Sequence, residues 1–196
     1  TIIATGGREY RGTDYLLGQH PAAMTMGDLE KALKADDPRL RQAKRIVIVQ
    51  CVGPWNEQHP FYCSRVCCTV TMKNILKLKK LNPSCQIYVL YKDIRTYGAL
   101  EEMYTAARQA GAIFVRYSDD DLPVAQAAGN AIEVSFTEPG LKERLTVTAD
   151  LLVSATAIVP SKGAEELSRA FKIPQTQEGF FQEAHPKLRP VDFASD

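Results

Sequence analysis

The pattern of hydrophobic and polar positions predicts alternating strands and helices in the middle of the chain. Residues 46–49, IVIV, form a continuous β-branched run that is typical of a strand covered on both faces. The runs QIYVLY at 86–91 and AIFVRY at 112–117 predict two further strands. Helices are expected between them, over about 64–81 and around 100–110, because their composition and the spacing of their apolar residues favour helix. This alternation predicts a right-handed βαβαβ unit with a parallel sheet.

The residues before this unit predict a strand-like start, a short helix and a linker. The segment TIIATGG, 1–7, is an apolar, β-like run that ends in a glycine turn. Thr25 and Asp28 have the pattern of a capping box, so a helix is expected near 26–35. The polar, proline-containing segment 35–44 is expected to be a linker.

The residues after the unit have a different pattern of apolar and polar positions. Runs at 130–139 and 142–159 are joined by Pro139–Gly140, which predicts an antiparallel hairpin. A brief helix is expected over 161–171, and 172–190 is loop-like. The predicted fold class is α/β, with a Rossmann-like βαβαβ parallel sheet and an antiparallel β-hairpin addition. This is the layout of the NAD-binding domain in thioredoxin-reductase-type flavoproteins.

Composition narrows the choice of partners. The 196 residues include 24 basic and 23 acidic side chains, and a net charge of +1 gives no bulk attraction to nucleic acid or anionic lipid. The apolar runs fall short of the ~20 residues that a membrane helix needs, so no direct membrane insertion is expected. With no secretory signal pattern, we expect a cytoplasmic, reducing compartment, where clustered cysteines hold metal or carry out redox chemistry.

The turn after the first strand of the unit differs from a dinucleotide-binding loop. Such a loop reads G-x-G-x-x-G, so that backbone amides reach a pyrophosphate at the helix N-terminus. Here Gly53 is followed by Pro54 and the bulky Trp55. Because Pro54 has no N–H to donate, the usual phosphate site is predicted to be lost.

Four of the five cysteines occupy this turn instead: Cys51, Cys63, Cys67 and Cys68. Cys63 and Cys67 share a face if the helix has already begun at Cys63, and Cys68 is turned by about 100° from Cys67. The positive end of a helix stabilises thiolates. A [4Fe-4S]²⁺ core neutralises half of the charge of four thiolates, and Arg65 offsets part of the rest.

Three interpretations of these cysteines compete. Zinc usually takes paired C-x₂-C or Cys/His ligands, which are absent here, although His59 is available as a substitute ligand. Free thiols or a disulfide are the second interpretation. The irregular spacing and the dicysteine favour the third, an iron–sulfur cluster. Cys85 is expected to be an inert core residue.

Polar residues also follow the second strand of the unit. They are Lys92, Asp93, Arg95 and Tyr97, at the strand end where α/β folds bind ligands. They are interpreted either as a lip near the cofactor or as ion pairs that anchor the loop. Trp55 and Phe61 are expected either to shield a cluster from water or to anchor the cysteine loop.

These motifs resemble a known family. QCVG, then YCSRVCC on the next helix, then YVLYKDIRTYG resemble the A subunit of heterodisulfide reductase, an iron–sulfur flavoprotein. They also resemble the related subunits of quinone-interacting membrane-bound oxidoreductase complexes. IIATGG at the start and EAHPKLRPVDFASD at the end look like segments that connect to the family's flavin domain.

The resemblance implies an FAD protein with several [4Fe-4S] clusters that passes electrons among flavin, clusters and partner subunits, in some members by electron bifurcation. One family cluster is held by cysteines that include a dicysteine, and the four cysteines of the turn match that set. Thr5, Gly6 and Gly7 match the flavin-side turn. The family's G-x-G-x-x-G and C-x₂-C-x₂-C motifs are absent here. FAD is therefore expected in the full-length protein, and this piece is not expected to be catalytic alone.

The expected organisation follows from the same resemblance. Both ends look cut, so we expect an internal fragment with three parts: 1–40 from the flavin domain and connecting helix, 41–160 the Rossmann-like domain with the cysteines, and 161–196 returning to the flavin domain. The expected function is electron transfer through one [4Fe-4S] cluster. Expected partners are the rest of the flavoprotein chain and other heterodisulfide reductase or electron-input subunits. The alternatives are a redox-silent scaffold that docks partner subunits, with any metal such as zinc purely structural, and an NAD(P)H-binding module.

Overall fold

The computed structural model of the protein describes residues 1–55 and 61–193, which group into two compact units. We call the larger one the sheet unit; it consists of Arg11–Gly53 and Cys63–Ala157. The other, the terminal unit, combines Thr1–Tyr10, Pro54–Tyr62 and Ile158–Asp196. The three parts expected from the sequence, with boundaries at residues 40 and 160, were defined by resemblance to a longer flavoprotein. That division stays a prediction.

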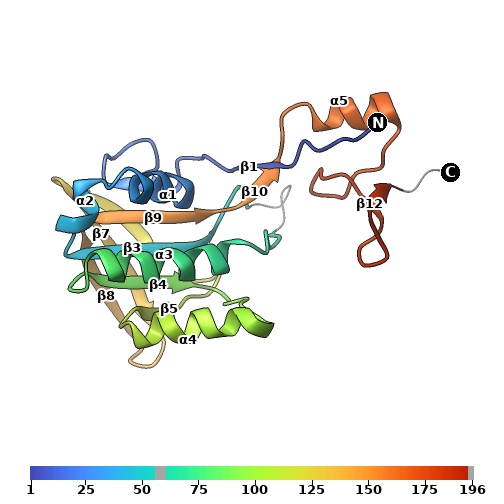
Figure 1. Cartoon of the computed structure of the whole chain (residues 1–196). Coiled ribbons are helices and arrows are strands. Elements are labelled where there is room, and N and C mark those ends of the chain that lie inside the picture. Colours follow the sequence, from blue (N-terminus) through green and yellow to red (C-terminus); the bar gives the residue numbers. More distant parts are fainter. Residues whose placement is uncertain (56–60, 194–196) are drawn as a thin grey trace. The chain divides into compact units, whose positions relative to one another are not determined.

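The sheet unit is built on five parallel strands (Figure 1). In spatial order they are β2 (Ala23–Thr25), β9 (Leu151–Thr156), β3 (Arg45–Val52), β4 (Gln86–Tyr91) and β5 (Ile113–Arg116). The strands β3, β4 and β5 are the three that the apolar runs predicted. The connections between them contain helices, which confirms the predicted Rossmann-like unit.

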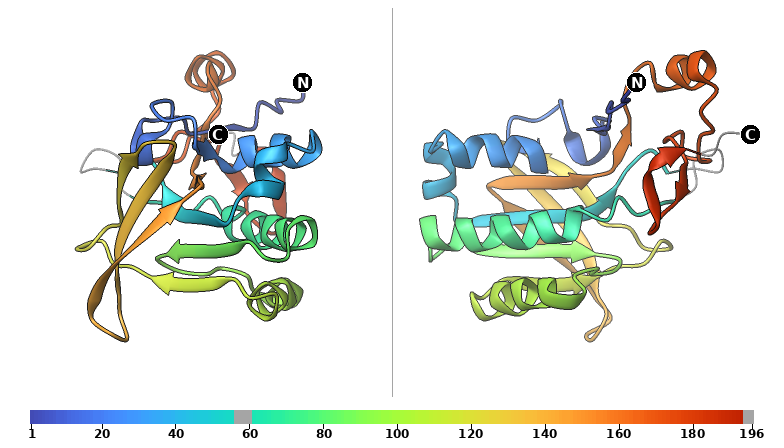
Figure 2. Two further views of the ribbon diagram at one scale, coloured as in Figure 1. Left: turned by 90° about the vertical axis from the view of Figure 1, so that its left-hand side faces the viewer. Right: turned by 45° about the vertical axis from the view of Figure 1, so that its right-hand side comes forward.

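Two different layers cover the faces of this sheet. The helices are α1 (Met26–Lys34), α2 (Pro38–Gln42), α3 (Cys67–Leu81) and α4 (Glu101–Gln109). The antiparallel strands are β6 (Val124–Ala128), β7 (Ala131–Glu138) and β8 (Glu143–Ala149). Figure 2 shows α1, α3 and α4 on one side of the parallel sheet and the antiparallel strands on the other. The predicted hairpin is confirmed as β7–β8, and β6 extends it to three strands.

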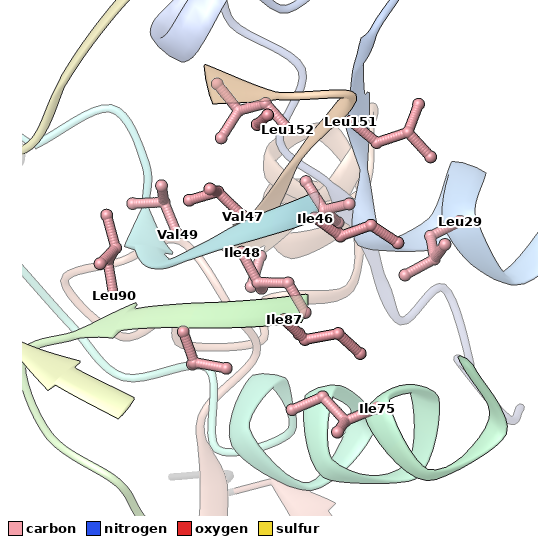
Figure 3. Packing of buried hydrophobic residues seen from close by; sticks show 14 of the residues in the cluster. Leu29, Ile46, Val47, Ile48, Val49, Ile75, Ile87, Leu90, Leu151 and Leu152 are labelled. Atoms are coloured by element: carbon pink, nitrogen blue, oxygen red, sulfur yellow. The ribbon is translucent and has the colours of Figure 1, made fainter. Parts of the chain in front are cut away.

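The core depends on alternation along β3. Ile46 points toward Leu29 of α1 and Ile48 points toward α3, where Ile75 packs, whereas Val47 and Val49 point to the opposite face (Figure 3). These side chains have no exposed surface. A strand that is buried on both faces can carry apolar residues at every position, which explains the continuous run.

The predicted linker at 35–44 was wrong, because it contains the helix α2. Asp37 caps this helix with a side chain that accepts from the N–H of Arg39 at 2.9 Å, and Pro38 occupies its first turn. Proline is favourable at that position because its missing N–H has no partner there in any case.

Two other boundaries differ from expectation. The helix expected from about residue 64 begins at Cys67, because Arg65 adopts a left-handed conformation with φ of 64°. The single long run at 142–159 divides into β8, in the antiparallel sheet, and β9, in the parallel sheet. Between them Asp150 accepts hydrogen bonds from the N–H groups of Lys44 and Arg45 at 2.7 and 2.8 Å, which fixes the start of β3.

The terminal unit contains short paired strands and one helix. They are β1 (Gly7–Glu9), which pairs with β10 (Ile158–Pro160), the helix α5 (Ala164–Phe171), and the hairpin β11 (Glu183–His185) with β12 (Arg189–Phe193). The brief helix is confirmed. The β-like run expected over 1–7 was wrong, since residues 1–6 are not a strand. The loop-like stretch contains the hairpin, in whose turn the His185 ring accepts hydrogen bonds from the N–H groups of Lys187 and Leu188.

Among the helices of residues 1–55 and 61–193, none combines the length and the apolar character that crossing a bilayer requires.

The predicted capping box at the start of α1 is confirmed and gives a stability test. The Thr25 hydroxyl accepts from the N–H of Asp28 at 3.2 Å. Thr25→Ala removes this cap, so we expect the free energy of unfolding to fall by about 1 kcal/mol. Denaturant titration measures the change. Thr105→Ala, at an exposed position inside α4, is the control and should change stability by less than about 0.5 kcal/mol. Equal effects of the two substitutions would contradict the cap.

Candidate functional site

The candidate site lies at the carboxyl edge of the parallel sheet. Cys51 is near the end of β3, and Cys67 and Cys68 form the first turn of α3. Cys63 lies in the loop between these elements. In α/β folds this edge is where ligands bind, because the loops that follow the strands all meet there.

Cys51 is placed by an irregularity in β3. Val49 pairs with Ser154 and Val52 pairs with Thr156, so β3 has one more residue than β9 over this interval. This is a β-bulge, which redirects side chains at the end of a strand. Cys51 takes a left-handed backbone with φ of 60°, a conformation that costs a residue with a Cβ roughly 1–2 kcal/mol.

Tyr117 holds this bulge in place. Its hydroxyl donates a hydrogen bond of 2.7 Å to the backbone carbonyl of Gln50, and both residues are buried. A buried carbonyl without a partner is unfavourable, so this bond stabilises the irregular strand end. Burial raises the pKa of Tyr117, with smaller contributions from Tyr15 and Cys51. The phenol therefore remains a neutral donor beside Cys51.

Cys63 precedes the helix and does not belong to it. Since α3 begins at Cys67, the condition for a shared helical face of Cys63 and Cys67 is not met. The Cys63 sulfur instead accepts a hydrogen bond from the N–H of Arg65 at 3.3 Å. The left-handed turn at Arg65 thus separates Cys63 from the helix and brings it to the site from a loop.

The two cysteines of α3 contact two different strand ends. The Cys67 thiol faces the carbonyl of Thr156, at the end of β9, at 3.7 Å. The Cys68 thiol faces the carbonyl of Asp93, after β4, at 3.7 Å. The N–H of Arg95 donates to the Cys68 sulfur at 3.4 Å. The dicysteine therefore bridges the ends of neighbouring strands on either side of β3.

The thiols share one electrostatic environment. Burial raises the pKa of Cys67 to about 12, and Cys68, Cys51 and Cys63 add to this effect. Burial and Cys68 raise the pKa of Cys51 to about 11. Burial also raises the pKa of Cys68, and the N–H of Arg95 opposes this. In the described chain none of these cysteines forms a disulfide.

The geometry does not present a preformed single-ion site. Within residues 1–55 and 61–193, no three His, Cys, Asp or Glu side chains are grouped as ligands of one metal ion. A single Zn²⁺ needs four ligand atoms within about 2.0–2.3 Å of one point. Four thiols are the donor set that a [4Fe-4S] cluster takes, with one thiolate on each iron. His59, the substitute zinc ligand, lies outside the described residues.

Ion pairs hold the loop after β4, as one of its two interpretations expected, and the other interpretation, a lip near the cofactor, stays a prediction. The ion pairs are Lys92 with Asp119, Arg116 with Asp93 at 3.4 Å, and Arg95 with Asp93 at 3.9 Å. These pairs anchor the loop. The Lys92 ammonium also favours the Cys51 thiolate, so it opposes the rise that burial causes in the pKa of Cys51. Tyr97 is largely exposed.

The residues matched to a flavin turn lie in the terminal unit. The Ser161 hydroxyl donates to the carbonyls of Thr5 and Gly6 at 2.7 and 3.1 Å. A Cβ on Gly7 would lie 2.5 Å from the side chain of Ile158, so strand packing alone requires glycine there. FAD binding at these residues stays a prediction.

Two further sequence candidates have simple structural roles. Trp55 packs edge-to-face against Phe61 at 5.3 Å and Tyr62 at 5.0 Å, which is consistent with anchoring the loop. Cys85 is buried just before β4, at the edge of the sheet opposite to the other cysteines. It is the natural control for them.

Sequence reasoning missed Tyr117 and Thr156 as parts of this site. Tyr117 directly follows β5, and Thr156 is the last residue of β9. The sequence indicated these two residues only by their place at the ends of strands, because side chains at the ends of parallel strands meet at the carboxyl edge of the sheet. The long apolar run that contains Thr156 concealed that strand end.

No family model matches the chain. Comparison with curated proteins finds relatives that are longer than this chain. The chain is 33% identical over 211 residues to the A subunit of the H(2):CoB-CoM heterodisulfide,ferredoxin reductase of Methanothermobacter marburgensis, with 100% of this chain and 32% of that protein covered. It is 31% identical over 210 residues to the iron-sulfur A subunit of the CoB--CoM heterodisulfide reductase of Methanocaldococcus jannaschii, with the same coverage of 100% and 32%. The chain thus spans about a third of the length of these two relatives.

The comparison with solved structures concerns the fold. Thioredoxin reductase from T. acidophilum superposes with a TM-score of 0.60 at 9% identity, over 100% of this chain and 56% of that one. Identity this low shows the fold alone. It confirms the predicted likeness to thioredoxin-reductase-type proteins.

The role of Tyr117 can be tested by removing one oxygen atom. Tyr117→Phe leaves the Gln50 carbonyl buried without its donor, so we expect the free energy of unfolding to fall by about 1–3 kcal/mol. Chemical denaturation measures this value. Tyr97→Phe removes an exposed hydroxyl and serves as the control, with no change expected. Unaltered stability of Tyr117→Phe would show that the bulge does not need this bond.

Proposed function

Because the chain belongs to the family of heterodisulfide reductase A subunits, we propose that its sheet unit is an electron-transfer module with one [4Fe-4S] cluster. Cys51, Cys63, Cys67 and Cys68 are the proposed ligands. The observation that carries the proposal is their meeting, as thiols, at the carboxyl edge of the sheet from three separate segments. When bound, such a cluster supplies a one-electron redox centre.

The chemistry of the donor set supports this assignment. Four neighbouring thiols cannot all ionise without a cation, because each thiolate opposes the next and burial opposes them all. A metal group supplies the missing positive charge and displaces the protons. The Lys92 ammonium, the Arg95 N–H and the N-terminus of α3 then stabilise the remaining negative charge.

The chain itself orients the proposed ligands and sets how far they are exposed to solvent. The bulge and Tyr117 orient Cys51, and the first turn of α3 orients the dicysteine. The Cys68 side chain is buried, whereas the other three proposed ligands are partly accessible. This exposure supports electron exchange at the carboxyl edge, where a donor or acceptor approaches most closely.

The activity of the whole protein is part of the proposal. We propose that the full-length protein binds FAD and that this module passes electrons between flavin and partner subunits. The Methanocaldococcus jannaschii relative is named as an iron-sulfur subunit, which supports both iron–sulfur chemistry and a multi-subunit setting. The module alone is not proposed to complete a catalytic cycle.

Iron uptake tests the proposal directly. Anaerobic reconstitution with iron and sulfide should load about four irons per chain and produce broad visible absorbance. Cys67→Ser and Cys68→Ser should each lower the iron content or change the spectrum of the reduced cluster, because each removes a thiolate. Iron and acid-labile sulfide assays with electron paramagnetic resonance (EPR) spectroscopy measure these outcomes.

Cys85→Ser is the matched control, since it changes a buried cysteine at the opposite edge of the sheet. Its iron content should equal that of the unmodified protein. Unchanged iron and spectra in both dicysteine variants would falsify the ligand assignment. Stoichiometric zinc with no iron uptake would instead favour a redox-silent scaffold.

A further inference from the structure

Several buried polar side chains have atoms without hydrogen-bond partners in the described residues, and Gln50, Thr71 and Thr156 are the three of them that lie beside the cysteines. Thr156 is slightly exposed, whereas Gln50 and Thr71 have no exposed surface. In residues 1–55 and 61–193, neither amide atom of Gln50 nor the hydroxyl of Thr71 has a partner. Leaving such a group unsatisfied costs about 1–3 kcal/mol, so a native site supplies a partner.

Gln50 and Thr71 each neighbour a proposed ligand. Gln50 lies in the bulge of β3 and immediately precedes Cys51. Thr71 lies four residues after Cys67 on α3 and therefore shares its helical face. Each unsatisfied group is thus next to, or one helical turn from, a proposed ligand.

Farther along α3, the buried side chains are those of Met72, Asn74, Ile75 and Leu78. The Asn74 amide N–H donates to the sulfur of Met26, and its Oδ1 has no partner in the described residues. Gln50 and Thr71 differ from Asn74 in lying next to the cysteines, so a partner for them would belong to the cysteine site. The negatively charged sulfurs of an iron–sulfur cluster accept hydrogen bonds, and donors to those sulfurs tune its reduction potential.

We propose that the Gln50 amide and the Thr71 hydroxyl donate hydrogen bonds to sulfur atoms of the cluster and raise its reduction potential. This inference rests on the proposed function and adds to it two residues that contact the cluster. Reduction adds negative charge to the sulfurs, which donors stabilise. Removing a donor should therefore favour the oxidised state.

Two substitutions that preserve side-chain size test this idea. Gln50→Met and Thr71→Val should retain iron, and each should shift the ratio of oxidised to reduced cluster about tenfold toward oxidised at a fixed potential. For a one-electron couple this equals about 59 mV. Anaerobic redox titration followed by EPR spectroscopy measures the shift. Thr71→Ser keeps the hydroxyl and should restore the original potential.

Asn74→Leu is the control, because Asn74 is also a buried amide on α3 but donates to the sulfur of Met26 at 3.2 Å. It should alter stability and leave the potential unchanged. Unshifted potentials in the iron-loaded Gln50→Met and Thr71→Val proteins would overturn the inference and assign both groups to buried water. If one of these two variants fails to fold, the reduction potential of the other variant tests the inference. Absence of iron in the unmodified protein would overturn the proposed function, and this inference with it.

Discussion

The left-handed backbone of Cys51 is the constraint on which this site depends. A residue with a Cβ keeps that conformation only where its surroundings impose it. Here the surroundings are the bulge in β3, the bond from the N–H of Ala157 to the carbonyl of Val52 at 2.7 Å, and the bond from Tyr117 to Gln50. Without them β3 would continue its regular alternation and would present Cys51 differently. The packing of the sheet therefore stabilises the geometry that the chemistry needs.

The same edge explains why thiols can stand where a related fold holds phosphate. Phosphate binders offer glycine amides and the positive end of a helix to an anion. In this chain Pro54 removes an amide, but the helix N-terminus remains, and Lys92 contributes a further positive charge near Cys51. An environment suited to a pyrophosphate is equally suited to thiolates that surround a metal group. In our account the positive environment at this edge of the sheet is retained, and a thiolate-bound metal group takes the place of the pyrophosphate.

The sequence predicted much of this architecture because its strongest patterns are local. The run 46–49, the capping box at Thr25 and the proline–glycine turn each specify one element without help from distant residues. The bulge at Cys51 was not predictable, since it depends on Tyr117, which is distant in sequence, and on pairing with β9. The start of α3 was placed too early because the left-handed turn at Arg65 leaves no compositional signal. The grouping of four cysteines followed from topology, whereas their detailed contacts required the tertiary structure.

The central claim is that these four thiols hold one iron–sulfur group. Anomalous diffraction at the iron absorption edge, from crystals grown without oxygen, tests it most directly. The account predicts one compact iron peak bounded by the sulfurs of Cys51, Cys63, Cys67 and Cys68. Bare thiols with no iron between them, or iron bound elsewhere on the chain, would contradict it.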